Sequence, residues 1–90
     1  MRLDFNETNI LIYTIADLEQ FKKPVNKNTL VAFLHEMLET TDKKRFLVLQ
    51  SIRSLSAKLE TLSDKSIDKI VADVHNNKVV ATARYVLPRL

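Results

Sequence analysis

The stretch TDKKRFLVLQSIRSLSAKLETL, residues 41–62, decides the fold. Apolar residues recur in it at spacings of four and three, which places them in one narrow stripe on a helix. The stripe consists of Val48, Ile52, Leu55, Leu59 and Leu62. We therefore predict that residues 41–62 form one helix, the longest in the chain, and that the other helices pack around it.

The start of this helix is apolar on nearly every side. Residues 46–49 read FLVL, and consecutive residues on a helix point about 100° apart. Val48 belongs to the stripe, Leu47 and Leu49 project to either side of it, and Phe46 lies almost opposite, near Arg53. Either other helices cover this end completely, or Phe46 or Leu47 stays exposed in a patch that another chain covers. We predict the second, with a partner-binding surface at Phe46, Leu47, Leu49 and Arg53.

Length and composition indicate one soluble domain over residues 1–90, of which 46% are hydrophobic and 28% charged. The chain has no glycine, so phosphate-cradling loops and tight hairpins are not expected, and helices joined by short polar links remain. It has no cysteine, which fits a cytoplasmic setting. We expect no signal region at the start and no membrane span.

The other elements are also predicted as helices. Asp4 or Asn6 begins the first helix, with Glu7 in a capping box, and residues 21–25 end it. Asn26 or Asn28 caps a second helix that runs to about residue 39. A further helix starts after Ser63 and is broken by residues 75–77. Residues 78–87 favour a fifth helix, with a strand as the alternative. The predicted fold class is all-α, a compact bundle of about five helices.

Candidate chemistry is sparse. His35 and Glu39 lie one helical turn apart and could share a metal ion, but two histidines and no cysteine supply no full ligand set. The serines lack a nucleophile-elbow pattern, which needs glycine. We expect Ser54 and Lys58 to lie on solvated helix surface. We therefore predict no catalytic residue, no metal site, no cofactor and no enzyme activity.

Basic residues gather before the second helix and at the start of the predicted central helix. Cations at a helix start oppose its dipole, so a partner could be the reason for their presence there. If the two segments lie on one side, six cations could contact a phosphate backbone. The possible nucleic-acid-binding residues are Lys22, Lys23, Lys27, Lys43, Lys44 and Arg45.

Residues 10–38 resemble the opening of winged-helix proteins, in which a helix, a Pro-Val turn and a capped second helix precede a recognition helix. The matching residues are Pro24, Val25, Asn28 as cap, Leu30 and Leu34. This resemblance implies a recognition helix that starts at residue 43. That helix continues with the apolar residues 46–49, which do not suit a surface facing a DNA groove. The glycine-bearing wing is missing as well.

These observations favour a small helical protein–protein interaction module that regulates or adapts another protein. The partner would be another protein chain or a second copy, giving a homo-oligomer. A basic, winged-helix-like nucleic-acid-binding domain of a transcriptional regulator is the alternative. The formal net charge of +3 permits an acidic partner without requiring one.

Overall fold

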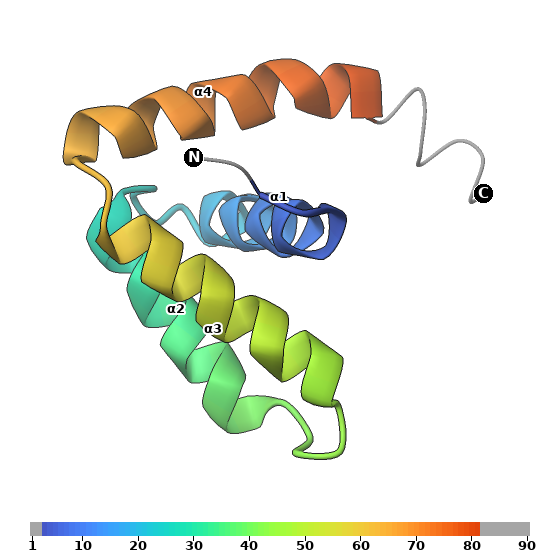
Figure 1. Ribbon diagram of the computed structural model, residues 1–90. Helices are drawn as coiled ribbons and strands as arrows, with labels where there is room; N and C mark the ends of the chain where they lie inside the picture. Colours follow the sequence, from blue (N-terminus) through green and yellow to red (C-terminus); the bar gives the residue numbers. More distant parts are fainter. Residues whose placement is uncertain (1–2, 82–90) are drawn as a thin grey trace.

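The computed structural model describes the backbone of residues 3–81 and the side chains of residues 3–76. This part of the chain forms four α-helices and no strand (Figure 1). The helices are α1 (Phe5–Gln20), α2 (Lys27–Thr40), α3 (Phe46–Glu60) and α4 (Asp64–Ala81). The prediction of an all-α fold is confirmed.

Two predicted helix starts are confirmed by their caps. The carboxylate of Asp4 accepts a hydrogen bond from the Glu7 backbone N–H at 2.7 Å, and Glu7 accepts one from the Asp4 N–H at 3.0 Å. The Asn26 side chain accepts from the Thr29 N–H at 3.0 Å, so Asn26 rather than Asn28 is the cap of α2. Each cap satisfies a backbone donor that a helix start otherwise leaves without a partner.

The prediction of a long central helix over residues 41–62 is wrong. α3 has 15 residues, fewer than α1 or α4. Thr41 ends α2, and the Asp42 side chain accepts from the Lys44 N–H at 2.9 Å while its carbonyl accepts from the Arg45 N–H at 3.0 Å. These bonds fold residues 42–45 into a turn, so α3 begins at Phe46 and not at residue 41 as predicted.

The predicted helix break at residues 75–77 is also wrong, because α4 continues through it to Ala81. Asparagine costs a helix only about 0.7 kcal/mol relative to alanine, and neither glycine nor proline occurs there to stop it. Residues 78–81, predicted to open a separate helix or a strand, belong to α4. The remainder of that predicted segment, 82–87, lies outside the described residues.

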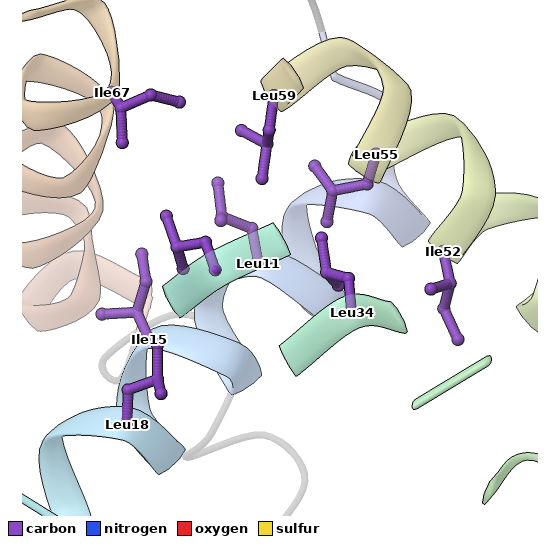
Figure 2. Packing of buried hydrophobic residues seen from close by; sticks show 9 residues of the cluster. Leu11, Ile15, Leu18, Leu34, Ile52, Leu55, Leu59 and Ile67 are labelled. Carbon is purple, nitrogen blue, oxygen red and sulfur yellow. The ribbon is translucent and has the colours of Figure 1, made fainter. Parts of the chain in front are cut away.

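α2 and α3 form an antiparallel hairpin, α1 crosses it, and α4 lies along the other side of α1 (Figure 1). Their apolar faces meet in one core, to which α4 contributes Ile67 (Figure 2). The core cluster is Leu11, Ile15, Leu18, Leu30, Leu34, Ile52, Leu55, Leu59 and Ile67.

The predicted stripe of α3 is confirmed at its centre and shifted at its ends. Ile52, Leu55 and Leu59 are fully buried, whereas Val48 is half-buried. Leu49 is buried as well, so the covered face of α3 is rotated toward the side of Leu49. The opposite flank of the first turn is consequently left uncovered.

Candidate interaction surface

The turn that joins α2 to α3 forms the outer end of the hairpin, at the bottom of Figure 1. The Thr41 N–H donates to the Met37 carbonyl at 2.9 Å and closes α2. The Lys43 ammonium donates to the Leu38 carbonyl at 3.4 Å, near the negative end of the α2 dipole. The turn is therefore held by its own backbone and by the end of α2.

Phe46 and Leu47 stand exposed directly after this turn. Phe46 is 76% exposed and Leu47 is 75% exposed, the largest values among the exposed large hydrophobic residues described. The prediction that Phe46 or Leu47 remains exposed is confirmed for both. Leu49, also predicted for this surface, is only 3% exposed and packs inside the protein.

We call residues 44–47 the hairpin tip. Arg45 occupies the N-cap position of α3 without a side-chain cap, and the first turn of α3 holds no acidic residue. Lys44 and Arg45 are exposed beside Phe46 and Leu47. The tip therefore presents two cations next to two apolar side chains, at a helix start where cations are electrostatically unfavourable.

Leu47 also forms one wall of shallow hollows between α3 and α1. One hollow, of about 190 Å³, is lined by Asn6, Asn9, Ile10, Leu47, Val48 and Ser51. A second, of about 280 Å³, adds Asp4, Gln50 and Ser54 around the same leucine. A third, of about 300 Å³, lies over residues 44–48. An apolar side chain with polar rims of this kind is the usual composition of a protein contact surface.

Arg53 is exposed and lies seven residues after Phe46, two helical turns along the same side of α3. It therefore extends the face of Phe46 rather than that of Leu47. Of the four residues predicted for partner binding, Phe46, Leu47 and Arg53 lie at the surface and Leu49 does not.

The six predicted nucleic-acid-binding residues lie in two groups at opposite ends of α2 (Figure 1). Lys22, Lys23 and Lys27 lie at its start, and the other three lie in the turn after its end. A helix of 14 residues is about 21 Å long, so the groups do not form one patch. Lys27 also donates to the Leu62 carbonyl at 2.7 Å, which ties the start of α2 to the end of α3.

Glu7 holds the other end of α3, and sequence reasoning recognised only its capping role. Its side chain is 1% exposed, accepts from Ser54 at 2.7 Å and forms an ion pair with Lys58 at 2.8 Å. Ser54 and Lys58, which were predicted to face solvent, are therefore half-buried against Glu7, although the Lys58 side chain remains 37% exposed. Burial raises the pKa of the Glu7 carboxyl, but hydrogen bonds from the Asp4 backbone, Lys58 and Ser54 outweigh it and lower the pKa from 4.5 to about 2.

Both histidines contact single carboxylates. His35 lies 3.5 Å from the carboxylate of Glu60 on α3, and His75 lies 2.9 Å from that of Glu19 on α1. Among the described residues, no group of three or more His, Asp or Glu side chains could hold a metal ion. Within the same part of the chain, no helix is long and apolar enough to cross a membrane.

Comparisons with known proteins give no relative: no family model, no curated protein and no solved structure matches this chain.

Proposed function

We propose that the chain is a small helical module that binds another protein chain, and that the hairpin tip is its contact surface. The observation that supports this most is the exposure of two neighbouring large apolar side chains, Phe46 at 76% and Leu47 at 75%. As a module that regulates or adapts its partner, the protein needs no catalytic group at this surface.

Folding alone gives no reason for this exposure. The core is complete without the tip, because none of its members comes from residues 44–47. Lys44 and Arg45 also disfavour the start of α3 through the helix dipole. Apolar side chains at the surface and cations at a helix start are both features that contact with a partner would compensate.

Nucleic-acid binding is the second candidate, and the geometry favours it less. Because the length of α2 separates the two basic groups, a phosphate backbone would meet three of the six residues at one place. Phe46 and Leu47 stand exposed beside the three cations that follow α2. A salt titration with duplex DNA separates the candidates, since phosphate contacts weaken steeply as salt rises.

The test uses Leu47→Glu, with Ala72→Glu on α4 as the matched control. Both positions are exposed, so both variants should keep the helical circular dichroism spectrum and the melting temperature of the wild type. A photo-crosslinking phenylalanine analogue at position 46 then reports any chain that contacts the tip. The same analogue at position 72 reports background.

We expect a protein cross-linked at position 46 but not at position 72. Unlabelled wild type and the Ala72→Glu variant should compete with that cross-link, and Leu47→Glu should not. Competition by all three proteins would mean that the contact surface lies elsewhere. The absence of any cross-linked protein, including a second copy, would refute the proposed function.

A further inference from the structure

A larger hollow lies beside the tip, between α1 and α2. It encloses about 390 Å³, and we call it the acidic groove. Its lining residues are Tyr13, Asp17, Phe33, Glu36, Met37, Thr40 and Thr41.

The groove combines aromatic rings with carboxylates. The rings of Tyr13 and Phe33 meet edge to face, with their centroids 6.4 Å apart. Asp17 and Glu36 supply two negative charges, and no lysine or arginine lines this hollow. Such a groove suits a cationic side chain accompanied by an apolar one, because carboxylates and aromatic faces both attract cations.

The groove and the tip open on the same flank of α1. Asn6 and Ile10 line a hollow with Leu47, whereas Tyr13 and Asp17 line the groove. These four α1 residues recur at spacings of four, three and four, which places them on one side of the helix. The groove ends at Thr41, and the tip begins three residues later. The two surfaces therefore adjoin at the outer end of the hairpin.

We propose that the occupant of the groove is the hairpin tip of a second copy of this chain, an inference that rests on the proposed function of the tip. In a two-fold dimer, each copy places Lys44, Arg45 and Phe46 against the groove of the other, so the same contact forms twice. The contact pairs Lys44 and Arg45 with Asp17 and Glu36. A symmetric contact of tip against tip would instead bring like charges together.

Two double variants test this pairing by reversing one side of it. Asp17→Lys with Glu36→Lys makes the groove basic, and Lys44→Glu with Arg45→Glu makes the tip acidic. Asp17 lies in the last turn of α1, and Lys44 and Arg45 lie at the start of α3, so these three reversals are favourable for the helix dipoles, whereas Glu36 lies before the last turn of α2 and its reversal should be nearly neutral. Loss of association is then separable from loss of the fold, which circular dichroism and melting curves monitor.

The measurement is sedimentation velocity at concentrations up to about 1 mM. The wild type should dimerise, and each double variant alone should dimerise more than about tenfold more weakly, because both contacts become repulsive. Mixing the two variants should restore dimers, since the basic groove meets the acidic tip and the acidic groove meets the basic tip. The quadruple variant should also dimerise.

Three outcomes overturn the inference. They are a monomeric wild type, double variants that dimerise as the wild type does, and a mixture that stays monomeric. A monomeric wild type whose tip still cross-links to another protein refutes the second copy as occupant and leaves the proposed function in place. The absence of both dimer and cross-link refutes both.

Discussion

The two ends of α3 contrast in what they leave to solvent. At its start, Phe46 and Leu47 are exposed apolar side chains. Toward its other end, Ser54 and Lys58 enclose the carboxylate of Glu7, which is 1% exposed. A carboxylate can be buried where each of its oxygens accepts a hydrogen bond, whereas an apolar side chain stays exposed where no other helix covers it. The difference indicates that the end near Glu7 serves the fold, and that the tip is available to a partner.

The largest expected effect is a loss of core packing at Leu55, which is fully buried in α3. Leu55→Ala should lower the free energy of unfolding by about 2–5 kcal/mol, because it removes buried apolar contacts and leaves a cavity. Urea unfolding followed by circular dichroism measures this change. A loss below about 0.5 kcal/mol, the range typical of surface positions, would mean that Leu55 does not pack in the core and that this part of α3 does not hold the fold together.

Glu7→Gln should give the next largest effect. The amide keeps the size of the side chain but removes the charge that Lys58 and Ser54 surround, at a cost of about 1–3 kcal/mol of unfolding free energy. The matched control is Glu39→Gln, at an exposed position of α2. Equal stability of the two variants would show that the buried cluster does not hold α1 to α3.

Acid should weaken the same cluster, because protonation of Glu7 removes the charge that Lys58 and Ser54 surround. Its folded pKa of about 2 lies below the ordinary value of 4.5, so its stabilisation is complete above about pH 4.5 and is lost as pH falls toward about 2. The unfolding free energy of Glu7→Gln should therefore fall less over this window than that of the wild type. If the unfolding free energies of the two proteins fall in parallel over this pH range, Glu7 is not the group whose protonation weakens the fold.

The sequence pattern was sufficient for the fold class and for the centre of the core. The spacing of Ile52, Leu55 and Leu59 predicts a buried stripe because helical periodicity is local. The turn at residues 42–45 was missed because Asp42 can cap either a helix or a turn before it. The α4 boundary was misplaced because asparagine weakens a helix without ending it.

The candidate surface was predictable in part for the same reason. Four consecutive apolar residues cannot share one face, so helix geometry predicts that some of residues 46–49 point away from the buried stripe, and either a neighbouring helix covers them or they stay exposed. Whether the side of Leu47 or the side of Leu49 is covered depends on where α1 and α2 lie, which the local pattern does not report. In the structure the side of Leu49 is covered, and Leu49 is buried. The cluster at Glu7 joins parts of the chain that are far apart in sequence: Ser54 follows Glu7 by 47 positions and Lys58 follows it by 51. No local sequence pattern reports such contacts.

The smallest expected effect sharpens the contrast within a single turn of α3. Leu47→Ala should change the free energy of unfolding by less than about 0.5 kcal/mol, because Leu47 is 75% exposed and alanine is the better helix former. Leu49→Ala, two residues later and 3% exposed, is the matched control and should cost about 2–4 kcal/mol. Chemical unfolding of both variants at a concentration where the protein is monomeric isolates the fold from any association. If Leu47→Ala destabilises the monomer as much as Leu49→Ala does, Leu47 belongs to the core. A small effect on the monomer combined with weaker partner binding would instead separate the role of Leu47 from that of Leu49.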